Sequence, residues 1–281
     1  MSTRSNELPA PPRSLPRPRP SSLNPTWRRR LKGLALPLLI VVALEFIVRL
    51  GWLPSYQMPA PSEIALTLTD LAEGALWKHI SASLLRVLLG FAIGASLALV
   101  FAAWVGLSRE AEAYLEPTFA ALRSIPSLAW VPLLLLWLGI DETSKIVLIA
   151  IGAFFPVYVN VVAAIRNIDR KLVEVGRIYG FSRWQLVRRI LLPAALPGLF
   201  TGLRSGMSLA WMFLVAAELI AATKGLGYLL SDGRETSRPD IVLAAIIVLA
   251  LLGKLSDGLL AVLERRWLIW RDTFTGQEAQ D

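Results

Sequence analysis

Residues 171–193 read KLVEVGRIYGFSRWQLVRRILLP, a basic segment with helical spacing in the middle of a mainly apolar chain. Asp169 is placed to cap a helix over 170–179, in which apolar or small residues recur every three or four positions. Gly180 can supply the left-handed residue that ends such a helix. Ser182 and Gln185 then fit a capping box that starts a second helix. The segment is therefore predicted to form two short helices joined at a glycine corner.

Six apolar runs surround this segment. Of the 281 residues, 55% are hydrophobic and only 18% are charged. The runs cover residues 34–53, 84–107, 118–138, 144–164, 195–221 and 241–263. Each has about the 20 residues that a helix needs to cross a hydrocarbon layer of about 30 Å. The sequence therefore predicts an all-α integral membrane protein with six transmembrane helices in the lipid bilayer.

Basic residues are distributed unevenly between the predicted loops. Residues 1–32 carry eight Lys and Arg and seven prolines, which is typical of a disordered tail. With this tail in the cytoplasm, 19 Lys and Arg fall in cytoplasmic segments and four in outer segments. The positive-inside rule thus places both termini and residues 171–193 in the cytoplasm, and it accounts for the net positive charge without nucleic acid. On the outer side, Ser62 is predicted to cap a surface helix that ends near residue 73.

The residue inventory excludes several kinds of chemistry. Because the chain has no cysteine and His79 is its single histidine, it can form no disulfide, no thiol nucleophile and no His- or Cys-based metal site. His79 also has no Asp near it in sequence with which to form a catalytic pair. The G-x-x-x-x-G-K-[ST] loop that holds nucleotide phosphates is missing. The chain is therefore predicted to be no enzyme and to bind no metal or cofactor itself.

The spacing within residues 171–193 allows two interpretations. An amphipathic helix lying on anionic lipid would have a similar charge pattern. The finer spacing resembles the EAA loop in permease subunits of bacterial ATP-binding cassette (ABC) importers. By that resemblance the motif positions are Glu174, Gly180, Ile190, Leu192 and Pro193, with departures at Val175 and Gly176, where the family has alanine. The resemblance implies a coupling loop at about 166–193 that docks into a cleft on a separate ATPase, which binds the ATP.

The resemblance extends over roughly residues 34–270. The stretches that carry it are GIDETSKIVLIAIGAFFPVYVN (139–160), IRNIDRKLVEVGRIYG (165–180), AELIAATKGLGYL (217–229) and LGKLSDGLLAVLERRWLIW (252–270). Within the class, the chain is similar to aliphatic sulfonate permeases, a group shared with taurine and nitrate permeases. The resemblance implies a type I ABC importer permease fold over residues 33–270, followed by a C-terminal tail at 271–281.

The implied function is import of an organosulfonate across the bacterial inner membrane. The implied assembly is a homodimer with cytoplasmic ATPase subunits and an extracytoplasmic solute-binding protein. Taurine, nitrate or another small solute would use the same machinery. The more distant alternative is an ion-coupled secondary transporter, which usually has unpaired midplane carboxylates and broken helices in repeated halves. The sequence shows neither feature.

Charged residues inside the apolar runs are candidates for function unless a partner neutralises them. Glu45–Arg49 and Lys254–Asp257 have the spacing of helical pairs and are predicted to be structural. The residues left without a partner are Arg86, Arg123, Lys145, Arg204 and Glu218. This excess of positive charge predicts a cavity suited to a small organic anion.

The run 195–221 is predicted to have two contrasting faces. Small residues recur every four positions and form a ridge for close helix packing, namely Gly198, Gly202 and Gly206. Arg204, Trp211 and Glu218 recur every seven positions, nearly opposite this ridge, and are predicted to line the translocation pathway. In the alternative interpretation, Arg204 snorkels to the cytoplasmic interface and Glu218 sits at the outer mouth.

Prolines and glycines mark two further runs. Pro126 and Pro132, which follow Arg123, are candidate pathway residues with it, because proline frees backbone carbonyls where a helix bends beside a cavity. Gly90 and Gly94 predict a packing face on the run 84–107.

Overall fold

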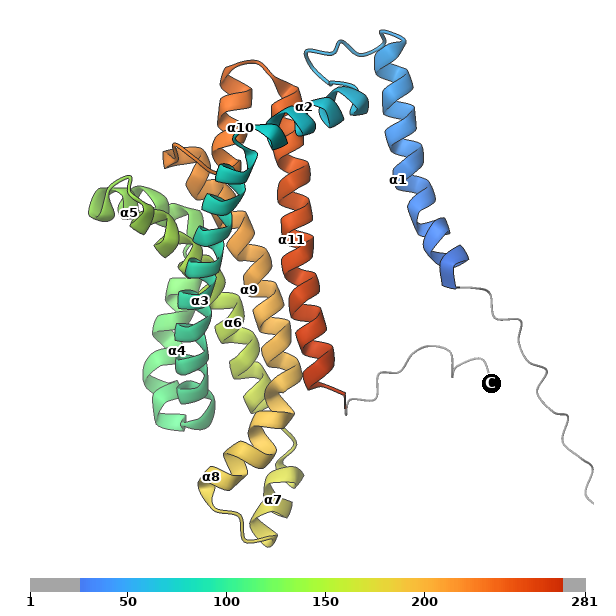
Figure 1. Cartoon of the computed structure of the whole chain (residues 1–281). Coiled ribbons are helices and arrows are strands. Elements are labelled where there is room, and N and C mark those ends of the chain that lie inside the picture. Colours follow the sequence, from blue (N-terminus) through green and yellow to red (C-terminus); the bar gives the residue numbers. More distant parts are fainter. Residues whose placement is uncertain (1–25, 270–281) are drawn as a thin grey trace, which may run out of the picture.

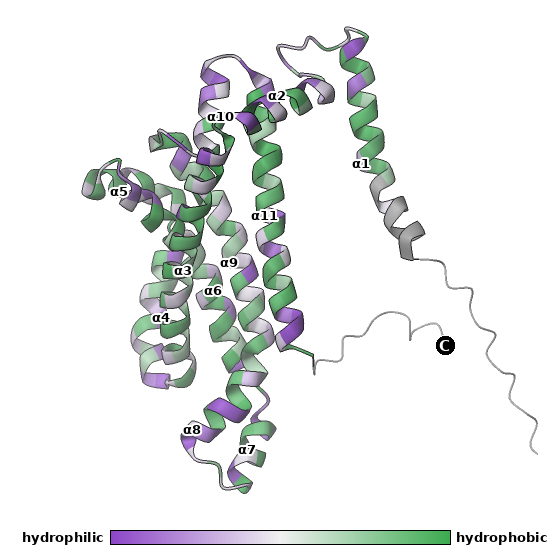
Figure 2. Cartoon of the chain, viewed as in Figure 1, coloured by the Kyte–Doolittle hydropathy of each residue, from purple (hydrophilic) through white to green (hydrophobic). Residues whose placement is uncertain are grey.

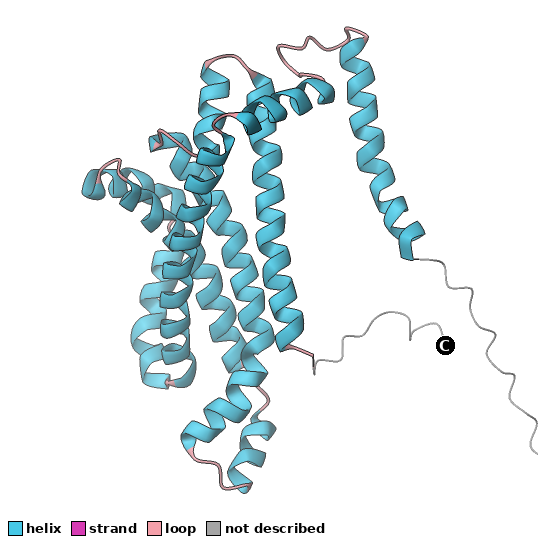
Figure 3. Cartoon of the chain, viewed as in Figure 1, coloured by secondary structure: helices cyan, strands magenta, loops and turns pink. Residues whose placement is uncertain are grey.

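The computed structural model describes residues 26–269, except the side chains of residues 26–32, 34 and 221. Every regular element in this part of the chain is a helix (Figure 3). In chain order the helices are α1 (Thr26–Arg49), α2 (Pro61–Glu73), α3 (Leu76–Leu107), α4 (Arg109–Ser124), a 3-10 turn (Ser127–Ala129), α5 (Trp130–Leu138), α6 (Glu142–Arg166), α7 (Arg170–Ile178), α8 (Arg183–Leu186), a π-helical turn (Val187–Leu191), α9 (Leu192–Ala221), α10 (Leu226–Glu235) and α11 (Pro239–Trp267). The predicted tails at 1–32 and 271–281 lie outside the described residues, apart from the helical backbone of residues 26–32.

Four described helices are long and apolar enough to cross a membrane: α3, α6, the helix Arg183–Ile220 that contains α9, and α11. A fifth candidate span is α4 together with residues 127–138. The first predicted run falls largely in α1. The expected all-helical membrane fold is confirmed, and the six predicted runs agree approximately with these candidate spans and α1. Figure 1 shows α3, α6, α9 and α11 running alongside one another, with α7 and α8 at one end and α2 and α10 at the other. Figure 2 shows that the long helices are mainly hydrophobic, whereas α7 and α8 carry many hydrophilic residues.

The third predicted span is not one straight helix. The chain bends by 80° between α4 and the 3-10 turn, where Ile125 is extended. Pro126 explains the break, because its ring excludes the helical conformation from the residue before it. Pro132 lies in the first turn of α5, where a helix needs no N–H donor, so it causes no bend. The prediction of a bend is confirmed at Pro126 only.

Glycines set the close packing of α3, α6 and α9. A Cβ atom on Gly94 of α3 would overlap the backbone carbonyl of Ala150 on α6, and one on Gly90 would lie 2.6 Å from Ile149 Cγ2. On α9, Gly198 faces Ala164 of α6, and Gly202 and Gly206 face the same helix. Both predicted packing faces are therefore confirmed, and α6 lies between α3 and α9.

Gly94→Ala should lower the free energy of unfolding by about 1–3 kcal/mol, the usual cost of overpacking a helix interface. The obstacle is backbone, which no side-chain rotation removes. Gly258→Ala on α11 is the matched control, because nothing lies within 4 Å of a Cβ atom there. Thermal unfolding of the detergent-purified proteins measures both effects. Equal stability of the two variants would contradict this account of the α3–α6 contact.

Helix α1 stands apart from the other long helices and packs on α2 (Figure 1). The predicted Glu45–Arg49 pair is confirmed at 2.6 Å. Ser62 does not cap α2 as predicted, because the helix begins at Pro61, with Ala60 as its N-cap, two residues before the predicted cap. The Ser62 hydroxyl donates instead to Glu45 at 2.7 Å, and this bond joins α1 to α2.

Candidate functional site

The hairpin formed by residues 169–191 has the predicted start and corner. The Asp169 carboxylate accepts a hydrogen bond from the backbone N–H of Lys171 at 2.9 Å and so caps α7. Gly180 has a φ of 72°, and nothing lies within 4 Å of a Cβ atom built on it. The N–H of Phe181 donates to the carbonyl of Gly176 at 3.0 Å, which is the bond that closes a glycine-ended helix. The glycine corner is thus required by backbone conformation.

The second arm of the hairpin continues directly into the membrane. Ser182 and Gln185 form the predicted capping box, with bonds of 2.8 and 3.3 Å. A π-helical turn, Val187–Leu191, joins α8 to α9 without a break in the helix. Pro193 has no N–H for the carbonyl four residues earlier, which accounts for the locally widened turn. The second arm of the hairpin and α9 therefore form one continuous helix.

Packing between the two arms explains one departure from the family motif. A Cβ atom on Gly176 would meet the side chains of Leu186 and Ile190. The missing methyl group at Gly176 lets these two side chains pack directly onto α7. Ile190 therefore belongs to the interior of the hairpin, whereas Leu192 and Pro193 form the first turn of α9.

The tip of the hairpin presents apolar side chains. The large ones that are exposed are Leu172, Val175, Ile178, Tyr179 and Trp184, of which Ile178 is 83% and Tyr179 76% exposed. Glu174 and Gly180 are exposed beside them. A contiguous apolar surface with a charged rim is typical of a protein–protein contact.

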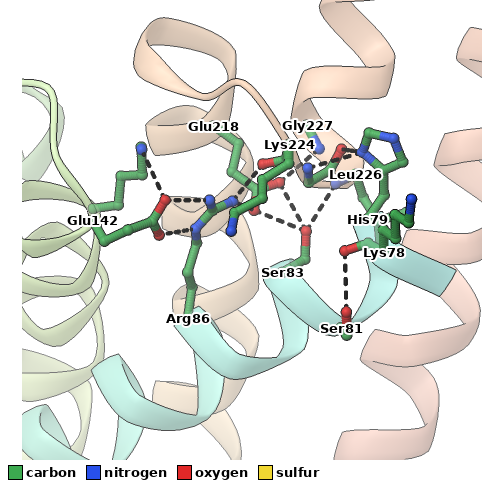
Figure 4. A network of polar contacts seen from close by, with 12 residues as sticks. Lys78, His79, Ser81, Ser83, Arg86, Glu142, Glu218, Lys224, Leu226 and Gly227 are labelled. Carbon is green, nitrogen blue, oxygen red and sulfur yellow. Dashed lines mark hydrogen bonds and ion pairs between the residues drawn. The ribbon is translucent and has the colours of Figure 1, made fainter. Parts of the chain in front are cut away.

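At the opposite end of the bundle lies an ion network, here called the Arg86 network: Ser83, Arg86, Glu142, Glu218 and the turn 224–227 (Figure 4). Its Glu142 side chain is half exposed. Arg86 of α3 donates to both carboxylate oxygens of Glu142 at 2.5 and 2.6 Å. Its third nitrogen donates to Glu218 of α9 at 2.6 Å. The side chains of Arg86 and Glu218 are only 3% and 0% exposed. The network therefore fixes α3, α6 and α9 to one another.

Side chains of the Arg86 network, together with His79, bind the backbone at the start of α10. Three successive backbone N–H groups each find a side-chain acceptor: Gly225 on His79 Nδ1, Leu226 on Ser83 and Gly227 on Glu218, at 3.0, 2.8 and 2.7 Å. The carbonyl of Lys224 accepts from Arg86. A carboxylate at a helix N-terminus is favoured by the unpaired N–H groups and the helix dipole. His79, the single histidine, thus has a structural role here.

The polar stripe of α9 is more paired than the sequence predicted. Arg204 forms a two-point ion pair with Asp257 of α11 at 2.8 and 3.0 Å and contacts Glu264 at 3.2 Å. Trp211 is buried and donates to Ser256 at 3.2 Å. The prediction that Lys254 pairs with Asp257 is wrong, because the Asp257 carboxylate pairs with Arg204 of α9. Arg86, Lys145, Arg204 and Glu218 were also predicted to lack partners, and this is wrong. Arg86 pairs with Glu218, Arg204 pairs with Asp257, and Lys145 contacts Glu142 at 3.4 Å.

The remaining candidate pathway residues do not join this stripe. Arg123, Pro126 and Pro132 lie at the exposed bend around residues 125–132. Sequence reasoning missed Ser83 and Glu142, although His79, Ser83 and Arg86 recur at helical spacing and mark a polar stripe on α3. Among the described residues, no cluster of three His, Asp or Glu side chains is arranged to hold a metal.

The sequence of residues 90–269 matches the model of the family described as "Binding-protein-dependent transport system inner membrane component". The chain belongs to this family. The permease is 43% identical to the "Putative aliphatic sulfonates transport permease protein SsuC" of Bacillus subtilis (strain 168), over 88% of this chain and 90% of the relative. It is also 43% identical to the protein of that name from Escherichia coli (strain K12), over 90% of this chain and 97% of the relative.

The solved structure titled "Crystal structure of an amino acid ABC transporter with histidines" has the same fold. The TM-score is 0.58 at 18% identity, over 72% of the permease and 97% of that chain. The expected ABC importer permease fold is thus confirmed, and the family is one of transport subunits of the inner membrane.

Proposed function

We propose that the permease imports a small organic anion, an aliphatic sulfonate, across the bacterial inner membrane. The observation that carries this proposal is the similarity, over about nine-tenths of the chain, to two permeases named for aliphatic sulfonates. Unpaired positive charge gives no support, because Arg86, Lys145 and Arg204 all have acidic partners.

In the proposed assembly two copies of the permease bind two cytoplasmic ATPase subunits and one outer solute-binding protein. The exposed apolar tip around Tyr179 and Trp184 is the proposed ATPase contact, with Glu174 and Gly180 at its centre. Ile190, Leu192 and Pro193 would connect this contact to α9. The permease itself performs no catalysis and binds no cofactor in this proposal. Both termini would lie in the cytoplasm.

The candidate pathway residues keep their proposed roles with altered details. Arg204, Trp211 and Glu218 would hold the walls of the pathway through their contacts with α11 and α3, instead of lining it as free groups. Arg123, Pro126 and Pro132 would act at the bend between α4 and α5.

Deletion of the gene tests the solute. We expect the deleted strain to lose growth on ethanesulfonate as the sulfur source and to grow normally on sulfate. Uptake of labelled ethanesulfonate should require the permease and an ATPase partner with an intact phosphate-binding lysine. Taurine and nitrate are the competing solutes, and uptake of either one in place of ethanesulfonate would overturn the sulfonate proposal. Uptake that persists with an inactive ATPase would favour an ion-coupled transporter.

A further inference from the structure

Helix α9 has three distinct faces, of which one has no partner in the described chain. The glycine face packs on α6, and the face with Arg204, Trp211 and Glu218 meets α11 and α3. The third face carries Thr201, Ser205 and Ser208 and, nearer to Glu218, Met212 and Leu219, all of which are exposed.

The hydroxyl groups form a compact patch at the middle of the helix. Arg204, Ser205 and Ser208 follow Thr201 by three, four and seven positions. All four residues therefore fall within an arc of about 100° around the helix axis. Arg204 lies about 18 Å along the axis from Leu192 and about 21 Å from Glu218. The patch therefore sits near the centre of the apolar span.

The exposed faces of two other long helices have a different composition. On α3 the large exposed residues are Leu88, Leu89, Ile93 and Leu97, and on α11 they are Ile247, Leu251, Leu255 and Leu259. Those faces suit lipid chains. The hydroxyl groups of Thr201 and Ser208 donate to the carbonyls of Pro197 and Arg204 within α9. The Arg204 side chain beside them does not suit lipid, because charged side chains inside a bilayer face protein or a water-filled cavity.

The neighbouring ion pair supports contact with water. The side chains of Arg204, Asp257 and Glu264 are 38%, 30% and 22% exposed, although they lie within spans. Contact between lipid and so much of a charged side chain, positive or negative, would cost free energy. Three of the five N–H groups of Arg204 bond to the two carboxylates, which leaves two donors without a partner among the described residues.

We propose that this face of α9 lines the water-filled path of the transported anion. The hydroxyl group of Ser205 and the two remaining donors of Arg204 would offer hydrogen bonds to the oxygens of a sulfonate. Arg204 and the nearby Lys254 together balance Asp257 and Glu264, so the anion meets donors without an uncompensated cation that would retain it. This inference rests on the proposed function, because the anion is the proposed solute.

Thiol labelling of the assembled transporter tests the proposal, since the natural chain has no cysteine. Ser205→Cys and Ser208→Cys permeases, with the ATPase and solute-binding partners in proteoliposomes, are treated with 2-sulfonatoethyl methanethiosulfonate, an anion that itself carries an alkanesulfonate. Leu97→Cys and Leu255→Cys are matched controls, because these positions are 49% and 67% exposed on the apolar faces of α3 and α11, and Leu255 lies two positions from Asp257, the partner of Arg204.

We expect both serine positions to react at least about tenfold faster than the leucine positions, because only a hydrated thiol ionises to the reactive thiolate. Excess ethanesulfonate and ATP should slow this reaction. Labelling as slow as the leucine controls, both at rest and during ATP turnover, would overturn the proposal and assign the face to the partner copy. Equally fast labelling by a trimethylammonium reagent would overturn the preference for anions. Unmodified permease that fails to take up ethanesulfonate would reject the proposed function instead, whatever the labelling result.

Discussion

Arg86→Met is expected to destabilise the permease by about 3–5 kcal/mol, the usual cost of leaving a buried charge without its partner. Glu218 would remain with no exposed side-chain surface and with only Ser83 and Gly227 as hydrogen-bond donors. Stability of a folded protein is typically about 5–15 kcal/mol, so much of it would be lost. Thermal unfolding of the purified protein and its amount in the membrane measure the effect.

A second substitution separates charge from packing in this prediction. Glu218→Gln keeps an acceptor for Gly227 and Ser83 but removes the charge, so Arg86→Met with Glu218→Gln should be more stable than Arg86→Met alone. Arg49→Ala is the control, because that arginine is 67% exposed and such a pair contributes about 0–1 kcal/mol. If the double variant were no better than the single one, burial of an unpaired charge would not be the cause.

The sequence predicted the fold because its main signals are local. Apolar runs gave the spans, and glycine spacing gave the faces of α3 and α9 that pack on α6. The caps at Asp169 and Ser182 and the corner at Gly180 also depend on residues within one or two turns. Such signals survive in any tertiary arrangement.

The ion pairs could not be predicted because they depend on how helices are rotated and at what depth they meet. Arg86 finds Glu142 and Glu218 at 56 and 132 positions along the chain. Asp257 has a suitable local partner in Lys254, yet it pairs with Arg204, whose planar guanidinium matches both carboxylate oxygens. The same rotation turns Trp211 and Glu218 towards other helices and leaves Thr201, Ser205 and Ser208 exposed.

Gly180→Val should reduce uptake and weaken association with the ATPase while the membrane helices stay folded. At a φ of 72°, a side chain with a Cβ atom adds about 1–2 kcal/mol to the backbone energy, and a branched one is especially unfavourable. The tip can relieve this strain by moving Tyr179 and Phe181 away from their positions. A change of this size alters an equilibrium by roughly 5–30-fold, which co-purification with the ATPase and labelled-solute uptake can both detect.

Two further variants distinguish the conformation of the corner from its location. Gly180→Asn adds a side chain of similar size, but asparagine tolerates the left-handed conformation, so it should retain more ATPase binding than Gly180→Val. Gly51→Val is the matched control, because Gly51 has a φ of 75°, the same open space and the same pattern of closing hydrogen bonds, but it ends α1 and is far along the chain from the hairpin. Its backbone cost should match that of Gly180→Val, whereas ATPase association should stay normal. If Gly51→Val released the ATPase as strongly as Gly180→Val, general destabilisation would explain both results and the hairpin would have no specific part in coupling. If Gly180→Val bound the ATPase and transported normally, the hairpin would not be the coupling element.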